Sequence, residues 1–398
     1  MSGAIEDGPE PREPLVLERF DVTAERGFLC PYDADSVCLP EPFSVIEEAG
    51  RELPRRMLTG RLRHYLRALP ELDLTPLLQA GQAPAVRKAM VRYSFLVQAY
   101  VWGERDAPQS LPACLARPIV QLAQALGQQP LLPYSAYVLD NWDRFDREGP
   151  IDLSNIYMIQ HFADGMDESW FVLIHVAIEA QAGSALALFP AILEAANHRD
   201  ETRLLRLLSD MAIVWQSVNR IFDRMPDHCD PHVYFTRVRP YIHGWKDNPA
   251  LGAGLVYDGC FDGAPQAYRG QTGSQSSIVP SMDALLGIGH DDDPLKAYLD
   301  ELHYYRPPQH RAFIDRVRAD STLRGVAADG TAALKDAYNQ VLRAVAAFRT
   351  RHLEYAASYI HRQALDHAGN HTDVGTGGTP FMRYLKKHRD ESEAQLLR

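Results

Sequence analysis

The feature that most constrains the fold of this chain is a long segment near its C-terminus, Leu334–Leu365, which contains neither glycine nor proline. Its apolar residues recur every three or four positions, the spacing that places side chains on one face of an α-helix. These residues are Tyr338, Val341, Val345, Phe348, Tyr355 and Tyr359. Because a helix gains most of its stability from packing of its apolar face, the segment predicts a core built from helices.

Other parts of the chain carry the same periodicity, whereas strand patterns are scarce. Helices are predicted at Ala85–Trp102, Leu153–Phe162, Trp170–Gln181, Ala185–Asn197, Glu201–Met225 and Ser281–Gly287. The first of these ends at Gly103, a residue type that commonly terminates helices. Leu255–Tyr257 has strand character but is too short to carry a sheet. The sequence therefore predicts an all-α fold.

The predicted elements differ along the chain in a way that suggests two domains. Residues 1–14 are acidic and rich in proline, as is typical of a disordered tail. Between 15 and 126, short helical segments are broken by proline-containing turns, and beyond 127 the helices lengthen. The proline positions are Pro40, Pro42, Pro54 and Pro70. We predict a small N-terminal helical domain over 15–126 and a large helical domain over 127–398.

Composition narrows the classes of partner. Lys and Arg number 41 against 52 for Asp and Glu, and this net charge of -11 repels nucleic acids and anionic lipids. The five cysteines form no metal-ligand or disulfide pattern, and no signal peptide is evident. The most apolar run, 170–196, is interrupted by His175, Glu179 and Gln181, so it predicts a buried helix and not a membrane span. We expect a cytoplasmic protein, a monomer in preference to an oligomer, that binds a small molecule.

His352 falls on the apolar stripe of the long C-terminal segment. A histidine that points into a helical core needs a partner for its ring nitrogens. Periodicity alone favours a hydrogen-bonded core histidine over a metal ligand. Arg349, one turn earlier, is either a surface charge or the partner of a bound anion.

Two further residues stand in unusual surroundings. His175 shares a helical face with Phe171 and Ile178, so it is either a core histidine or a polar group over a bound substrate. Arg239 lies among aromatic residues in YFTRVRPYIHGW. A guanidinium in such a setting suits a carboxylate, either of a substrate or of an acidic side chain in a structural salt bridge.

Long stretches without helical periodicity are often binding loops. Two occur here, Asn248–Ser277 and Ala368–Pro380. The second contains GTGGT (Gly375–Thr379), which lacks the ending and the preceding strand of a phosphate loop, but whose glycines suit a mobile lid. The acidic run His290–Pro294 lacks the further oxygen ligands of a calcium loop and is predicted to be a solvated turn.

An ordered set of motifs resembles the indoleamine 2,3-dioxygenase family over nearly the whole chain. It begins with ERGFLCP, AYVWG (99–103) and VLDNW (138–142), and continues with GWKDNPALGAGLVYDG (244–259), GSQSS (273–277) and MDALLGI (282–288). It ends with YRPPQHRAF (305–313), RTRHLEYAASYI (349–360) and GTGGTPFMRYLKKHR (375–389). Each motif is weak alone, but the ordered set is specific.

The resemblance implies an all-helical, two-domain fold with haem b in the larger domain and O2 as co-substrate. His352 matches the family's proximal iron ligand and Arg349 an arginine near a haem propionate, which overturns the core-histidine interpretation. Arg239 matches the arginine that pairs with the substrate carboxylate, and Phe171 an aromatic residue packed on the indole. The remaining residues expected to bind substrate are Tyr134, Tyr234, Thr272, Gly273, Thr376 and Gly377. The implied reaction opens the indole C2–C3 bond of L-tryptophan and yields N-formylkynurenine.

Departures from the family pattern leave the substrate open. Tyr234 stands where the family has phenylalanine, and Thr272 and His175 stand where mammalian members have serine. A distal histidine is also found in the related tryptophan 2,3-dioxygenases, where it contacts the indole N–H. We expect a bacterial member of this haem-dependent dioxygenase superfamily, with His175 in a catalytic role. The alternatives are a haem monooxygenase acting on an indole or phenol, and a non-catalytic haem or gas-binding protein.

Overall fold

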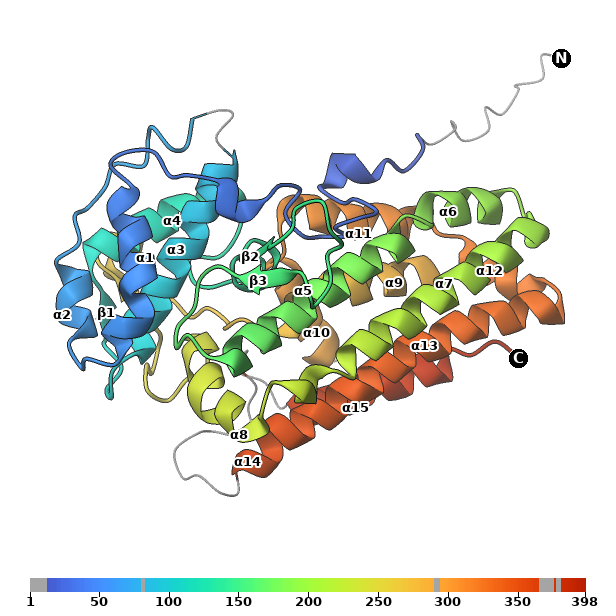
Figure 1. Ribbon diagram of the computed structural model, residues 1–398. Helices are drawn as coiled ribbons and strands as arrows, with labels where there is room; N and C mark the ends of the chain where they lie inside the picture. The colour runs from blue at the N-terminus through green and yellow to red at the C-terminus, as the bar shows by residue number, and fades with distance from the viewer. Residues whose placement is uncertain (1–12, 80–82, 290–293, 365–375, 377–380) are drawn as a thin grey trace, which may run out of the picture.

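The structure is a computed structural model that describes residues 13–79, 83–289, 294–364, 376 and 381–398. It is mostly helical, as the sequence predicts (Figure 1). The N-terminal helices are α1 (Ser44–Met57), α2 (Leu62–Arg67), α3 (Ala83–Trp102) and α4 (Ala113–Leu126), and they gather at one end of the molecule (Figure 1). The remaining helices are α5 (Met166–Leu186), α6 (Phe189–Asn197), α7 (Glu201–Phe222), α8 (Pro231–Val233), α9 (Ile278–Leu286), α10 (Pro294–His303), α11 (Pro308–Asp320), α12 (Leu323–Asp329), α13 (Ala332–Ala356), α14 (Arg362–Ala364) and α15 (Phe381–Ala394).

The long helices α5, α7 and α13 run side by side, and α15 lies along α13 (Figure 1). Helix α13 begins where the Thr331 side chain accepts a hydrogen bond from the Leu334 amide, a standard N-terminal cap. Beyond Ala356 the same helical path continues as a π-helical turn, Ala357–His361, and then as α14. The predicted long helix is therefore confirmed up to residue 364, with a π-turn that the periodicity does not reveal.

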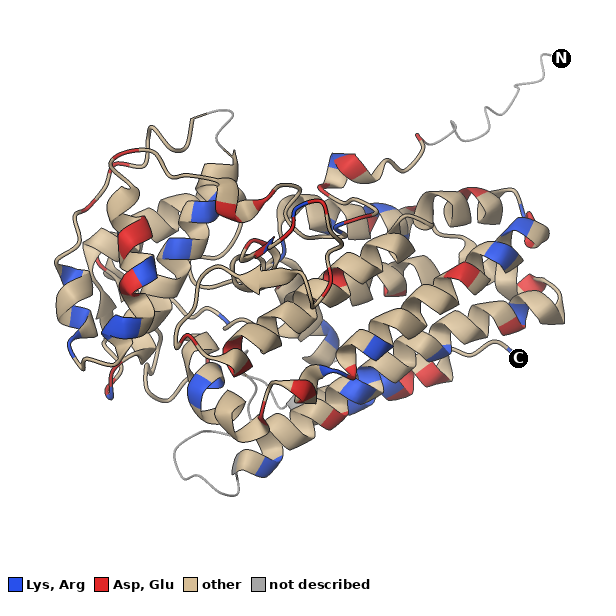
Figure 2. Ribbon diagram, viewed as in Figure 1, with Lys and Arg blue, Asp and Glu red and all other residues tan. Residues whose placement is uncertain are grey.

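The run Met166–Asn197 is apolar and long enough to cross a membrane by composition, but it is divided between α5 and α6. Its most apolar window is 67% buried inside the molecule. The prediction of a buried helix is confirmed, because α5 packs against α7 and supplies one wall of the core. Basic and acidic residues are both distributed along the helices and loops (Figure 2).

Two sequence predictions about local structure are wrong. Leu153–Phe162 is not a helix but a turn followed by β3 (Ile156–Met158), which pairs antiparallel with β2 (Trp142–Arg144). The reason is turn chemistry: the Asp152 carboxylate accepts hydrogen bonds from the amide and hydroxyl of Ser154, which favours a turn over a helix. The other small pair, β1 (Ser110–Leu111) with β4 (Val256–Tyr257), is parallel.

Pro54 lies inside α1 and not in a turn. A proline in a helix deprives the carbonyl four residues earlier of its amide partner. Here that carbonyl belongs to Gly50, and it accepts a hydrogen bond from the Gln160 side chain at 2.9 Å. Tertiary contact therefore compensates for the proline.

The division into domains at residue 126 stays a prediction, and the predicted tail lies almost entirely outside the described residues. Helices α10, α11, α12 and α15 were not predicted from periodicity. Pro308 at the start of α11 is a signal that could have revealed that helix, since proline is favoured in the first helical turn.

Candidate active site

A cavity of about 800 Å³ lies between α5, α7, α9, α10, α13 and the loop 271–276. This volume is in the usual range for cofactor and small-molecule sites, roughly 300–1,000 Å³. Nine residues predicted from the sequence line it: Tyr134, Phe171, His175, Tyr234, Thr272, Gly273, Arg349, His352 and Thr376. The fold thus brings together residues that are more than 200 positions apart in the chain.

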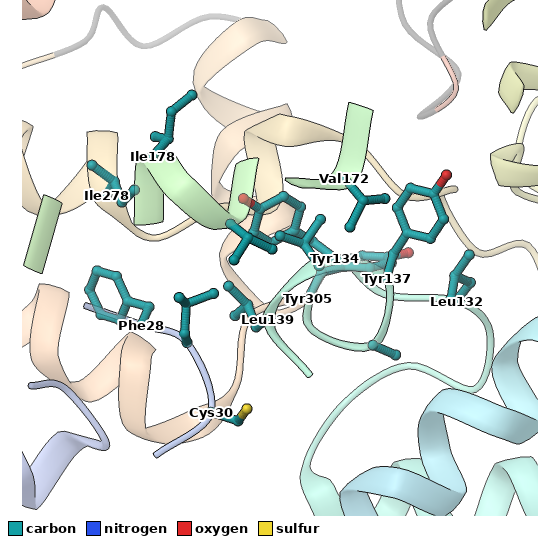
Figure 3. Close-up of a cluster of buried hydrophobic side chains, with 14 of the residues drawn as sticks. Phe28, Cys30, Leu132, Tyr134, Tyr137, Leu139, Val172, Ile178, Ile278 and Tyr305 are labelled. Carbon is teal, nitrogen blue, oxygen red and sulfur yellow. The ribbon is translucent and has the colours of Figure 1, made fainter. Parts of the chain in front are cut away.

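Three π-helical turns border this cavity: Ser135–Leu139, Tyr234–Val238 and Ala357–His361. Such turns are rare and occur often at functional sites, because the extra residue redirects the side chains around it. Tyr134, directly before the first turn, lines the wall, as do Tyr234 and Tyr359 within the other two. Figure 3 shows the first turn, with Tyr134, Tyr137 and Leu139, packed in one apolar cluster with Val172 and Ile178 of α5.

His352 lies on the face of α13 that borders the cavity, with the Phe222 ring centred 6.3 Å away. Within the described residues its imidazole has no hydrogen-bond partner. Burial lowers the pKa of His352 to about 4, with a smaller contribution from the nearby His175, so the ring is neutral at pH 7. A neutral imidazole that opens on a cavity presents a lone pair to a metal centre.

Arg349 is buried one turn before His352, and its guanidinium donates to the Asp283 carboxylate at 2.6 Å and also to the Ser392 hydroxyl. Arg349 and Asp283 both line the cavity. The arginine is therefore not a surface charge. It is a cation already paired with a carboxylate at the edge of the site.

His175 reaches the cavity from α5, and its hydrogen bond defines its tautomer. Nδ1 lies 2.7 Å from the Phe171 carbonyl oxygen, which can only accept, so Nδ1 carries the proton. Nε2 is left with its lone pair, and it faces the loop at Gly273, where an added Cβ would lie 3.9 Å from it. Burial lowers the pKa of His175, which keeps the ring neutral.

Aromatic rings continue the wall around His175. The Phe171 ring lies 4.7 Å from the His175 ring and 4.8 Å from that of Tyr234. Tyr234 is in turn 5.7 Å from Tyr359. These rings pack on one another and form a continuous aromatic wall, against which a flat apolar ligand can lie.

Arg239 is completely buried beside the Phe235 ring, whose centre is 5.6 Å from the guanidinium carbon. Burial lowers the pKa of Arg239 to about 10, so the group stays charged at pH 7. In the described residues it is not among those that line the cavity; its electrostatic neighbour Tyr234 lines the cavity instead. The structure does not bring Arg239 to the cavity surface, and Gly377 lies outside the described residues.

In the sequence Glu179 is only an interruption of an apolar run, yet in the structure it is buried and holds two residues that line the cavity. Its Oε1 accepts hydrogen bonds from the Tyr134 hydroxyl at 2.9 Å and the Ser276 hydroxyl at 2.8 Å. Burial raises the pKa of Glu179 to about 7 against the effect of both hydrogen bonds. A position four residues after His175 on the same helix is the signal that could have revealed it.

Comparison with known proteins decides the family. A family model described as indoleamine 2,3-dioxygenase matches residues 16–395. The chain belongs to the indoleamine 2,3-dioxygenase family. Indoleamine 2,3-dioxygenase 1 of Rattus norvegicus is 32% identical over 396 residues, with 96% of each chain covered.

Fungal members of the indoleamine 2,3-dioxygenase family are similar over comparable lengths. Indoleamine 2,3-dioxygenase nanC of Aspergillus nanangensis is 32% identical over 400 residues, covering 94% of this chain and 96% of its own. Indoleamine 2,3-dioxygenase of Saccharomyces cerevisiae is 28% identical over 425 residues, covering 95% and 93%. The protein is therefore an oxidoreductase of this family, and the family implies haem and an indole substrate.

The residues present fit a haem group. Within the described chain, no cluster of three His, Cys, Asp or Glu side chains could hold a bare metal ion. A single neutral histidine on a cavity wall is instead the donor that an iron porphyrin needs from the protein. The cavity also carries Phe222 and Phe348 beside His352 for the porphyrin faces, and Arg349 for a carboxylate edge.

Proposed function

We propose that this protein uses O2 and haem b to cleave the indole C2–C3 bond of L-tryptophan, or of a closely related indole, giving N-formylkynurenine. The observation that supports this best is that two neutral histidines, His352 and His175, open on one cavity from different helices. His352 presents a lone pair without a competing hydrogen bond among the described residues, and His175 presents a fixed acceptor beside an aromatic wall.

His352 would hold the cofactor through Nε2, and Arg349 with Asp283 would stand near its carboxylates. When bound, haem supplies the binding and activation of O2, which the axial ligand and the surrounding pocket direct. Since Arg349 already donates to Asp283, the pair fixes the position of the cation before any ligand arrives.

The substrate would lie against the wall formed by Phe171 and Tyr234, with its indole N–H directed at Nε2 of His175. A backbone carbonyl holds the imidazole, so this acceptor needs no rearrangement to receive the donor. The role of such an arrangement is orientation: the reacting carbons are presented in one pose, which reduces the entropy cost of reaction.

Arg239 would recognise the substrate carboxylate. The Arg239 guanidinium is buried, and its planar set of N–H donors suits a carboxylate, with which it can form paired charge-assisted hydrogen bonds. Burial raises the pKa of Tyr234 and the nearby Arg239 charge opposes that rise, so the arginine is close to a residue that lines the cavity. We propose that the carboxylate approaches Arg239 past the Tyr234 ring.

Water would be excluded from the site by apolar side chains and by the C-terminal loop. Ile178, Ile278 and Tyr359 line the cavity, and the Thr376 hydroxyl donates to the Gln271 carbonyl at 2.7 Å. That bond ties one residue of the GTGGT segment to the loop that faces His175. We propose that Thr376 and Gly377 belong to a lid that orders on substrate.

The experiment that tests the proposal is mass spectrometry of products made from L-tryptophan with 18O2 and ferrous protein. Incorporation of both oxygen atoms into N-formylkynurenine supports the proposal. One incorporated atom in a hydroxylated indole would make the protein a monooxygenase on the same fold. Absence of any oxygenated product, with haem bound, would leave a haem or gas-binding protein.

We also propose a monomer that works in the cytoplasm. The expectation comes from composition, namely reduced cysteines and a negative net charge. Sedimentation of the haem-loaded protein would detect a dimer.

A further inference from the structure

The side chain of Glu179 joins three separate segments at the cavity. It extends from α5 and accepts from Tyr134, which precedes the first π-turn, and from Ser276 in the loop Gly270–Ser277. Ser276 Oγ also accepts from the Ile278 amide at 3.3 Å. Since that amide occupies the acceptor side of the hydroxyl, its proton is directed to Glu179.

A second contact fixes the same loop to the backbone of Tyr134. The Gln275 side chain accepts from the Tyr134 amide and donates to the Gly270 carbonyl, both at 3.0 Å. Arg306 donates to the carbonyls of Ser274 and Ser276. The loop is therefore held along its length, and Glu179 is the one titratable acid in the described network.

The second oxygen of Glu179 shows which ionisation state this arrangement suits. Oε2 is buried and has no hydrogen-bond partner within the described residues. A carboxylate would leave half of a buried charge uncompensated at this atom, whereas a proton on Oε2 removes the charge and leaves Oε1 free to accept both hydroxyls. The closed loop thus suits the neutral acid.

We propose that Glu179 is a positioning residue that latches the loop Gly270–Ser277 onto Tyr134 and α5, and that loss of its proton releases this loop. The loop carries Thr272 and Gly273, which line the cavity, and Gly273 faces Nε2 of His175. Release of the latch therefore loosens the wall on the side where His175 acts. The inference rests on the proposed function only in regarding this cavity as the substrate site.

The direction of the pH effect follows from linkage. In the closed loop the pKa of Glu179 is raised to about 7, with burial as the main cause. When the loop opens and water reaches the carboxyl, its pKa returns toward the ordinary value of about 4.3 for glutamate. The closed state then binds the proton more tightly, so opening becomes easier as pH rises through this interval and levels off above pH 7.

The charged groups around Glu179 do not account for this behaviour. On the neighbouring segment Thr23–Gly27, which contacts the Glu179 backbone, Arg26 pairs with Asp33 and Glu25 with Arg144. In the described chain no charged side chain contributes to the pKa of Glu179. The other titratable groups on elements packed around it are Tyr134, His175 and Arg306.

Hydrogen exchange of the ferric holoenzyme without substrate tests the proposal. Protection factors of amides in 270–277, corrected for intrinsic exchange, should fall at least tenfold between pH 5 and pH 7.5. E179Q, which stays neutral and keeps an Oε1 acceptor, should remain protected at both pH values. Removal of a donor by Y134F should raise the pKa of Glu179 and move the midpoint to higher pH.

A matched control lies on the same helix. Glu168 is also buried with its pKa raised to about 7, but it accepts from the amides of Phe162 and Ala163, away from the loop. E168Q should leave the pH profile of 270–277 unchanged. Equal protection at pH 5 and 7.5 in the unmodified protein, or a slope that persists in E179Q, would overturn the proposal. Neither outcome depends on whether the protein oxidises tryptophan.

Discussion

Two histidines border one cavity, and the walls that carry them are built differently. On the α13 wall, His352 has no hydrogen-bond partner among the described residues. It has an aromatic neighbour, and burial lowers its pKa to about 4. On the α5 wall, His175 has Nδ1 bound to its own helix through the Phe171 carbonyl. Both rings are neutral, but only His175 has its tautomer fixed by the protein.

The difference shows how one residue type can serve two purposes. A ring without competing hydrogen bonds retains both nitrogens for a ligand, which suits coordination of a metal. A ring held at Nδ1 offers one directed acceptor, which suits orientation of an N–H donor. The supporting charges differ too: the α13 wall holds the ion pair Arg349–Asp283, whereas the α5 wall holds the uncharged latch of Glu179.

The largest effect is expected on the α13 wall, at His352. His352→Ala should lose most of its haem, because the substitution removes the imidazole that faces the cavity from α13. Haem content from the pyridine haemochrome spectrum and rescue by added imidazole measure this. Unchanged haem content with an unchanged ferrous spectrum would mean that another residue holds the iron. The proposed difference between the two histidines would then be wrong.

The buried ion pair should come next. Asp283→Ala leaves the Arg349 guanidinium buried without its main partner, which should cost about 3–5 kcal/mol of stability. Urea unfolding of the haem-free protein gives the free energy of unfolding directly. Arg351→Ala is a suitable control, because Arg351 pairs with Asp223 near the surface and its loss should change stability by about 1 kcal/mol or less. Equal effects of the two changes would mean that the buried pair has no special role.

Arg239 tests whether the buried cation near Tyr234 recognises the substrate carboxylate. Arg239→Ala should weaken the binding of L-tryptophan by about 2–5 kcal/mol, since it removes a buried charge partner. The binding of tryptamine, which has no carboxylate, should change little. KM values for both compounds measure the difference. Comparable losses for both would assign Arg239 a structural role, in agreement with its absence from the cavity lining.

The smallest effect is expected at His175. His175→Ser removes an acceptor for the indole N–H, a hydrogen bond worth about 0.5–1.5 kcal/mol. The kcat/KM for L-tryptophan should therefore fall more than that for 1-methyl-L-tryptophan, which has no indole N–H to donate. Ratios of kcat/KM for the two compounds provide the measurement. The same loss for both would mean that His175 shapes the pocket without orienting the indole.

Local sequence was sufficient for the main architecture of the large helices. The apolar stripe of α13 predicted the helix and the inward direction of His352, because helical periodicity depends only on neighbours along the chain. The motif set predicted the family, and nine of the predicted site residues line the cavity. Local pattern failed at Leu153–Phe162, where a turn at Asp152 outweighed apolar spacing.

Tertiary structure alone decided how the side chains meet. The Arg349–Asp283 pair joins segments far apart in the chain, and so does the hydrogen bond from Gln160 that compensates for Pro54. The position of Arg239 away from the cavity lining also depends on packing and not on local sequence. Tyr134, Glu179 and Ser276 likewise come from three separate segments: the residue before a π-turn, helix α5 and a loop. No periodicity relates such residues, because their contact depends on how helices pack and on which buried polar atoms must find partners.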